Sequence, residues 1–256
     1  MNKTGISWTD YSWNPASGCT PVSEGCAHCY AREWSKRWNR SFEVVLHPKK
    51  LDEPLRKNHE GDYVIPPGSK VFVNSMSDLF HEKVPFEFID DVFGMMATRR
   101  DVTFQILTKR PRRMEEYLDW SSQEGGEYGG GDYSENIWLG VSIENNRHLT
   151  RLYSLVDIHL TGWRTFISFE PLLEDIRVIT PAEWKFVDWI IVGGESGPHR
   201  RPFKVEWAYS LLEQARKQNV KFFFKQTGDL RPGSLKDVPE DLIVREFPTE
   251  TELGGA

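Results

Sequence analysis

The chain has 256 residues, 39% of them hydrophobic, so it can bury one sizeable core, and we expect a single domain spanning residues 1–256. Its formal net charge of −6 excludes a surface that is basic throughout, so any nucleic-acid contact would have to come from local clusters of cations. No apolar run approaches membrane-spanning length, and the start of the chain lacks the pattern of a signal peptide. We therefore expect a cytoplasmic protein without membrane contact.

Short apolar runs alternate with helix-like segments along most of the chain, a rhythm typical of βα units. The six clearest strands are expected at Val71–Asn74, Thr103–Leu107, Trp138–Val141, Thr165–Ser168, Trp189–Val192 and Val220–Phe224. Weaker candidates lie at Ser7–Trp13 and at Val44–His47, the second followed by a helix-like stretch, Lys49–Lys57. Because the clear strands are apolar throughout, we expect them to be parallel and covered on both faces.

Helical spacing of apolar residues predicts helices between these strands, at Ile89–Met96 and at Lys204–Gln218. Another helix is expected at Ala31–Trp38, and Pro111 is well placed to open one, because the first helical position needs no N–H. Residues 121–136 are rich in glycine and predict an inserted loop, and the tail from about residue 229 has scattered prolines and no period.

Cys19, Cys26 and Cys29 are the only cysteines, and they lie close together near the start of the chain. An odd number at this spacing is a poor disulfide framework, whereas thiolates are soft ligands suited to zinc or to an iron–sulfur cluster. A structural zinc would need a fourth protein ligand, with His28 or His47 available, whereas a cluster held by three cysteines leaves one iron open to a small molecule. The lack of a fourth cysteine favours the cluster, and zinc is the alternative.

Polar residues follow the C-terminal ends of all six clear strands, where parallel barrels gather their chemistry. They are Asn74, Ser75, Ser77 and Asp78; Thr108, Lys109 and Arg110; Ser142, Glu144 and Asn145; Glu170; Gly193, Gly194, Glu195 and Ser196; and Lys225 and Gln226. For each one, an ordinary helix cap or loop salt bridge is the alternative to a functional role. A zinc hydrolase using Asp78, His81 or Glu82 is a third possibility, although these residues do not form a recognised ligand spacing.

Two clusters of cations lie near the same strand ends. The first comprises Lys109, Arg110, Arg112 and Arg113, and the second comprises His199, Arg200 and Arg201. Contact with phosphate is one interpretation, and a solvated, charged helix start is the other.

A cysteine loop ahead of parallel strands resembles the radical S-adenosylmethionine superfamily, which binds that cofactor at the open iron of a [4Fe-4S] cluster. The usual superfamily motif has three and then two residues between its cysteines and an aromatic residue before the third. Here the first gap holds six residues, and His28 takes the aromatic place. The segment Ser77-Asp78 with Glu82 also distantly resembles the acidic region of spore-photoproduct-lyase-type radical enzymes.

Over almost its whole length the chain resembles a phage and prophage three-cysteine-motif family of largely unassigned function. The segments that carry this resemblance are Trp8–Asp10, Trp13–Pro15, the cysteine loop, Asn74–Glu82, Leu107–Pro111, Trp138–Ser142, Glu170–Leu173 and Val192–Pro198.

These resemblances imply an α/β fold, a radical-SAM-like TIM-type barrel, full or partial, with six to eight mostly parallel strands. They imply an enzyme that generates a 5′-deoxyadenosyl radical, for modification or repair of a nucleotide or DNA base. Its electrons would come from a reductase or a flavodoxin-type donor, in the cytoplasm of a bacterium or a phage-infected host. The alternative is a zinc-stabilised nucleic-acid-binding or regulatory module without catalysis.

The same resemblances imply roles for individual residues. Cys19, Cys26 and Cys29 would ligate the cluster, and Lys109 or Arg110 could bind the cofactor carboxylate. The candidate cofactor-binding residues are Tyr30, Ser75, Asp78, Lys109, Arg110, Glu144, Glu170, Gly193, Gly194 and Glu195. The candidate phosphate or nucleic-acid contacts are Lys109, Arg112, Arg113, Arg200 and Arg201.

Overall fold

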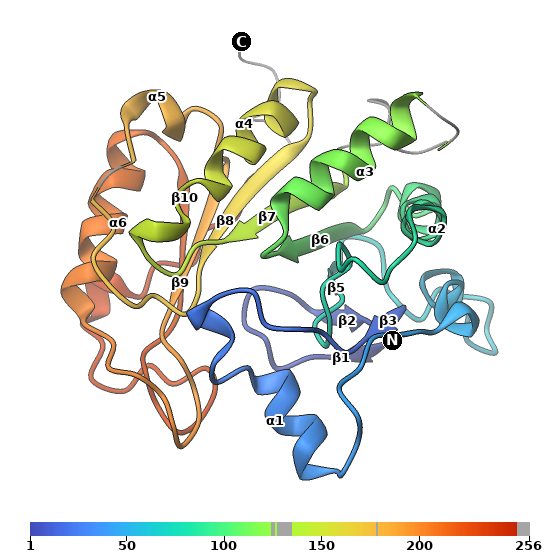
Figure 1. The fold of residues 1–256 in the computed structure, drawn as a ribbon, viewed down its shortest axis with the longest axis horizontal. Coiled ribbons are helices and arrows are strands. Elements are labelled where there is room, and N and C mark those ends of the chain that lie inside the picture. The colour runs from blue at the N-terminus through green and yellow to red at the C-terminus, as the bar shows by residue number, and fades with distance from the viewer. Residues whose placement is uncertain (124–125, 127–134, 178, 250–256) are drawn as a thin grey trace.

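A curled sheet of eight strands organises the computed structural model, which describes residues 1–123, 126, 135–177 and 179–249 (Figure 1). The strands run in the order β1 (Asn2–Lys3), β2 (Tyr11–Trp13), β5 (Lys70–Val73), β6 (Thr103–Thr108), β7 (Ile137–Ser142), β8 (Arg164–Phe169), β9 (Trp189–Gly193) and β10 (Lys221–Gln226). Within the described residues, the β1–β2 pair is antiparallel and every other neighbouring pair is parallel. The sheet is therefore a half-barrel with β1 and β10 as its two ends.

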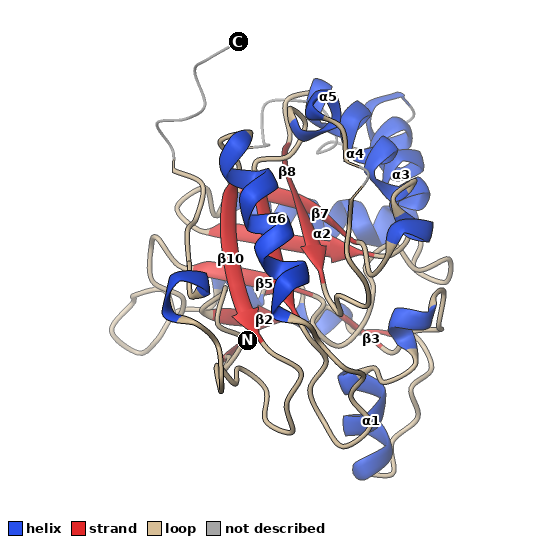
Figure 2. Cartoon of the chain, turned by 90° about the vertical axis from the view of Figure 1, so that its left-hand side faces the viewer, coloured by secondary structure: helices blue, strands red, loops and turns tan. Residues whose placement is uncertain are grey.

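Helices cover the convex face of this sheet (Figures 1 and 2). They are α2 (Phe86–Thr98), α3 (Pro111–Gln123), α4 (Arg151–Leu160) and α6 (Val205–Lys217), with the short α5 (Pro181–Trp184) near the same face. Helix α1 (Tyr30–Arg37) differs, because it projects from the end of the molecule where the cysteine loop lies. No helix in the described part of the chain is long and apolar enough to cross a membrane.

Along β5 to β10, apolar side chains enter two separate clusters, because successive side chains of a strand point to opposite faces. Val71 and Val73 pack in the large outer cluster beneath the helices, whereas Phe72 between them packs in the inner cluster. The inner cluster fills the concave face and comprises Trp8, Phe72, Trp138, Phe166, Trp189, Ile191 and Phe223. Burial on both faces explains why the strand sequences are apolar throughout.

The inner cluster depends on one small residue. Gly140 of β7 faces inward, and a Cβ built on it would lie 2.4 Å from the ring of Phe166 on the neighbouring strand. Glycine at this position therefore makes room for an aromatic ring inside the half-barrel.

The six strands expected most clearly from the sequence are confirmed as β5 to β10, and the predicted partial barrel of mostly parallel strands is confirmed. Two weaker strand predictions need correction. The strand expected at Ser7–Trp13 is only Tyr11–Trp13, and β4 (Val45–Leu46) pairs with β3 (Ala16–Ser17) in a separate two-stranded sheet rather than joining the barrel.

The helix expected at Lys49–Lys57 is wrong. Two short 3-10 helices, η2 (Pro48–Lys50) and η3 (Glu53–Leu55), stand there, because Pro54 has no N–H to donate and restricts the residue before it. The loop expected from residue 121 begins later, since α3 continues to Gln123, and residues 124–125 and 127–134 of that loop lie outside the described residues.

The tail beyond β10 contains the short helix η5 (Glu240–Leu242) and then runs along the edge strand. The N–H of Phe224 donates to the carbonyl of Val244 (2.7 Å), and the N–H of Glu246 donates to the carbonyl of Phe222 (2.9 Å). These bonds satisfy backbone groups that an edge strand would otherwise leave open.

Candidate functional site

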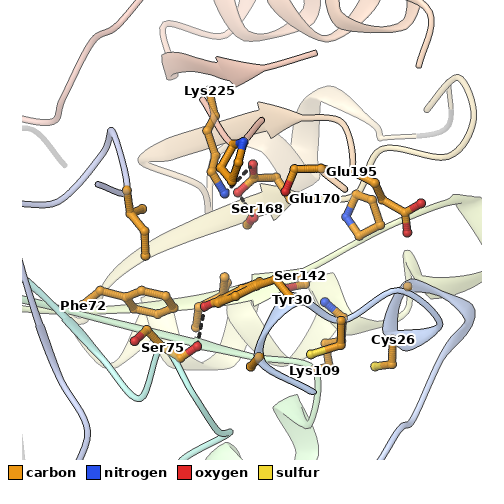
Figure 3. A pocket seen from close by; sticks show the side chains of 18 of the residues that line it. Cys26, Tyr30, Phe72, Ser75, Lys109, Ser142, Ser168, Glu170, Glu195 and Lys225 are labelled. Atoms are coloured by element: carbon orange, nitrogen blue, oxygen red, sulfur yellow. Dashed lines mark hydrogen bonds and ion pairs between the residues drawn. The ribbon is translucent and has the colours of Figure 1, made fainter. Parts of the chain in front are cut away.

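One cavity of about 610 Å³ opens at the C-terminal ends of the parallel strands (Figure 3). Three kinds of residue line it: the three cysteines, the polar residues that follow the strands, and apolar side chains from the concave face of the sheet. The last group includes Ile6, Trp8, Phe72 and Leu107. The cavity thus joins a cysteine loop to a largely aromatic floor.

Arg110, which follows β6, holds the first part of the cysteine loop. Its guanidinium donates to Thr20 O (2.9 Å) and Thr20 Oγ1 (3.0 Å), and to the sulfur of Cys19 (3.5 Å). On its other sides it pairs with Asp78 Oδ2 (3.1 Å) and with Glu82 Oε1 (3.1 Å). These bonds occupy every nitrogen of the guanidinium, and they tie Cys19 to the ends of β5 and β6.

Asp78 is the buried carboxylate among the partners of Arg110. Its carboxylate accepts hydrogen bonds from the N–H of Phe80 (3.1 Å), from Thr108 Oγ1 (2.7 Å) and from the N–H of Lys109 (3.2 Å), in addition to the bond from Arg110. A carboxylate with four donors is well satisfied although it has left water. The predicted cofactor residues Asp78 and Arg110 thus bind each other and hold the loop.

His81 supports the same loop from below. The N–H of Lys83 donates to His81 Nδ1 (3.1 Å), so the ring donates from Nε2 to Thr20 Oγ1 (2.9 Å). Burial and the nearby Arg110 charge lower the pKa of His81, which is consistent with the neutral ring that this arrangement needs. Asp78, His81 and Glu82 therefore hold the cysteine loop in place and do not form the zinc hydrolase site that was the third possibility.

Glu144, which follows β7, holds the second part of the loop. It is fully buried, and its Oε1 accepts from Ser23 Oγ (2.7 Å) and lies 3.3 Å from Lys109 Nζ, while Oε2 accepts from Arg151 (2.7 Å). Gly25 rests against this carboxylate so closely that a Cβ there would lie 2.4 Å from Glu144 Oε1. Burial alone would raise the pKa of Glu144, but the Lys109 and Arg151 charges lower it below its ordinary value.

The three cysteines are half-buried free thiols, which agrees with the expectation that they form no disulfide. Cys26 ends the 3-10 helix η1 (Glu24–Cys26), and Cys29 is the N-cap residue of α1. Burial and the Asp78 charge raise the pKa of Cys19 to about 11. At Cys26 burial also opposes ionisation, but backbone hydrogen bonds at Val22 and Ser23 and the Lys109 charge together lower the pKa.

Charged residues from β8, β9 and β10 lie across the cavity from Tyr30 and Phe72 (Figure 3). Glu170 Oε1 lies 3.1 Å from Lys225 Nζ, and its Oε2 accepts from Ser168 Oγ (3.1 Å). Tyr30 lies on the other side, and its hydroxyl donates to the carbonyl of Ser75. The cavity therefore has one wall that is aromatic and one that is ionic.

Gly193, Gly194 and Glu195 differ in what they reach. Gly194 lines the cavity, but both its backbone groups are bonded to Gln226, and a Cβ on it would lie 2.6 Å from the nitrogen of Gly228. Glu195 also lines the cavity and accepts from the backbone N–H (2.8 Å) and guanidinium of Arg201, which lower its pKa against the effect of burial. Gly193 packs against Glu170 behind the cavity wall.

The structure brings most of the predicted site residues to one place. Those that line the cavity are Cys19, Cys26, Cys29, Tyr30, Ser75, Asp78, Lys109, Arg110, Glu170, Gly194 and Glu195. Glu144 and Gly193 lie behind its wall, and their roles toward a cofactor stay predictions.

Each of the predicted phosphate contacts has a partner within the protein, although Arg112 is 90% exposed. Lys109 pairs with Glu144, and Arg201 pairs with Glu195. Arg112 lies 3.5 Å from Glu116, and Arg113 packs over the ring of Phe86 and also approaches Glu116. Arg200 donates to the carbonyls of Gly197 and Gly228. Arg112, Arg113, Arg200 and Arg201 do not line the cavity.

Asn14 and Asn74 hold the loop after β5 against the cysteine segment, a role that the sequence did not indicate for either residue. Asn14 Oδ1 accepts from the N–H of Met76 (2.9 Å), and Asn74, with a positive φ of 62°, accepts from the N–H of Ala16 (3.3 Å). The positive φ is a conformation in which asparagine is enriched, so the pair Asn74-Ser75 after a strand was a usable signal of a sharp turn.

The donor chemistry of the loop fits an iron–sulfur cluster, because three soft thiols reach a cavity large enough for a further ligand. Among the described residues, no group of three or more His, Cys, Asp or Glu side chains is arranged to hold a single metal ion.

Comparisons with known proteins agree with this architecture. The fold is similar to that of spore photoproduct lyase, a radical SAM fold, in a cysteine-to-serine variant (TM-score 0.55, 12% identity, 90% of this chain and 78% of that one). It is likewise similar to the enzyme complexed with dinucleoside spore photoproduct (0.55, 11%, 90% and 78%) and to a double variant with bound AdoMet and that dinucleoside (0.52, 11%, 86% and 64%).

A search of curated proteins finds no match to this sequence. A profile of the family described as "Protein of unknown function (DUF5131)" matches residues 3–251. The chain therefore belongs to the DUF5131 family.

Proposed function

We propose that this protein is a radical S-adenosylmethionine enzyme that acts on a nucleotide or a nucleic-acid base. The observation that carries the proposal is the meeting of three free thiols from one loop with the polar ends of six parallel strands in a single cavity. The fold of spore photoproduct lyase supports it, and that enzyme's structures with AdoMet and a dinucleoside favour a nucleotide-type substrate. Such a substrate suits the phage origin that the sequence resemblance implies.

Cys19, Cys26 and Cys29 would ligate a [4Fe-4S] cluster, and the residues of the ionic wall would bind the cofactor's polar groups. When bound, the cluster would supply one electron to S-adenosylmethionine, whose C5′–S bond would break to give methionine and a 5′-deoxyadenosyl radical that abstracts hydrogen. The electron would come from a reductase or a flavodoxin-type protein. The side chains of this protein would bind the cofactor and the substrate and orient them.

Two features of the cavity suit reactive chemistry. Trp8 and Phe72 are almost wholly buried, so the floor keeps water from one side of a bound substrate. The Glu170–Lys225 pair offers both an acceptor and a donor at the opposite wall, as recognition of ribose hydroxyls or of a cofactor carboxylate requires.

Release of 5′-deoxyadenosine tests the proposal. Anaerobically reconstituted protein, given dithionite and S-adenosylmethionine, should release it, and the matched variant with Cys19, Cys26 and Cys29 all replaced by alanine should not. Chromatography with mass detection measures the product. A wild-type protein that takes up iron and sulfide but releases no more product than the triple variant would contradict the proposal. One tightly held zinc per chain would instead favour the zinc-stabilised module.

A further inference from the structure

Helix α1 carries an exposed row of aromatic side chains that begins at the cavity. Tyr30, Trp34 and Trp38 recur at intervals of four and are 53%, 47% and 60% exposed. Residues four apart lie on one face of a helix, so the three rings form a stripe on one face of α1. The rings of Trp34 and Trp38 lie 6.1 Å apart, while Ala31 and Ser35 are the buried residues of this helix. Tyr30 also lines the cavity (Figure 3), so the stripe begins there.

Cations accompany this stripe. Residues 30–40 contain Arg32, Lys36, Arg37 and Arg40 and the single acid Glu33, a formal charge of +3 in a chain whose total is −6. Arg37 lies three residues after Trp34 on the same face, and the guanidinium of Arg40 stands 5.7 Å from the centre of the Trp34 ring. Lys36 pairs with Glu33, whereas Arg32, Arg37 and Arg40 have no ion pair within the part of the chain that the structure describes.

We propose that this aromatic and basic face of α1 binds single-stranded nucleic acid next to the nucleotide that enters the cavity. Exposed rings with interleaved arginines are how proteins hold single strands, since bases stack on the rings and the cations follow the phosphates. The inference rests on the proposed nucleotide-directed function. It differs from the expectation that Arg112, Arg113, Arg200 and Arg201 bind phosphate, because none of those four lines the cavity, whereas the α1 face begins at Tyr30, which does.

Fluorescence anisotropy with a labelled 12-nucleotide strand, as DNA and as RNA, tests this surface in the full-length, reconstituted protein. The Trp34→Ala/Trp38→Ala double variant should bind at least about tenfold more weakly, given the usual contribution of stacking per base. The Arg37→Gln/Arg40→Gln variant should also bind more weakly, and the slope of log Kd against log salt should shrink by about 1.4.

Two matched controls should bind as wild type does. Tyr153→Ala/Leu160→Ala removes two apolar side chains of α4 that are 61% and 68% exposed, and Arg177→Gln/Lys217→Gln removes two exposed cations elsewhere. The inference is overturned if wild type binds neither strand, if a control loses as much affinity as its α1 counterpart, or if wild type is a dimer that the double tryptophan variant dissociates. Because binding is measured without turnover, a failure here leaves the release of 5′-deoxyadenosine as a separate question.

Discussion

The two ion pairs of Arg110 allow a quantitative test of their contributions to stability, because one guanidinium pairs with two carboxylates that differ in burial. The side chain of Asp78 is 8% exposed and that of Glu82 is 63% exposed, while their distances to Arg110 are both 3.1 Å. Removing one partner of a buried ion pair costs about 3–5 kcal/mol, because the other charge stays buried without compensation. An exposed pair contributes only about 0–1 kcal/mol. We therefore expect Asp78→Asn to lower the free energy of unfolding several times more than Glu82→Gln does.

The expected order includes a third variant. Thr108→Val removes the 2.7 Å hydrogen bond to Asp78 but keeps the carboxylate, so it should cost about 1–3 kcal/mol, between the other two. Urea unfolding, followed by circular dichroism on samples of equal iron content, gives the differences from the midpoints and slopes. If Asp78→Asn does not fold, the order of Thr108→Val and Glu82→Gln still decides the matter. Equal losses for these two variants, or a loss below about 1 kcal/mol for Asp78→Asn, would refute the reasoning.

Three further predictions concern single positions. Gly18→Ala should destabilise the protein and lower its iron uptake, because a Cβ there would lie 1.9 Å from Glu43 O. Gly61→Ala, also at positive φ but in open space, should keep wild-type iron uptake. Thermal unfolding and iron analysis compare the two variants. Gly140→Ala should lower the unfolding free energy by about 1–3 kcal/mol by crowding Phe166, and an unchanged midpoint would contradict the packing described here. The stability difference between wild type and Glu195→Gln should be fully present above about pH 4.5 and should vanish as the pH falls further, because the folded-state pKa of Glu195 lies below its ordinary value. Urea unfolding midpoints measured across this pH range test the prediction. A difference in midpoint that stays constant would argue against the pair with Arg201.

Much of the barrel was predictable because both faces of its strands are buried, which leaves a strong signal in the sequence. The same burial fixed the register of Phe72 and Trp138 on the inner face, and strict alternation along each strand could have located the cavity floor. Asp78, Glu170 and Glu195, three of the polar residues that follow the predicted strands, all line one cavity.

The contacts that each of those residues makes could not be predicted, because they depend on distances across the fold. Arg110 was a candidate for the cofactor carboxylate, but its partners Thr20 and Asp78 lie 90 and 32 residues away in the chain. The ion-pair partners of the two cation clusters could not be identified from the sequence either, since Arg201 contacts Glu195 only when the loop after β9 folds back. Trp34 and Trp38 looked like ordinary helix residues until the packed face of α1 was known to be Ala31 and Ser35.

The most direct measurement of the central claim is the iron and sulfide content of anaerobically reconstituted protein, read together with its visible spectrum. We predict a brown protein with about four iron and four sulfide per chain, and large losses of both when Cys19, Cys26 or Cys29 is replaced singly by alanine. A colourless protein that holds one zinc and no sulfide, or full iron and sulfide content in any of the three single variants, would contradict this prediction.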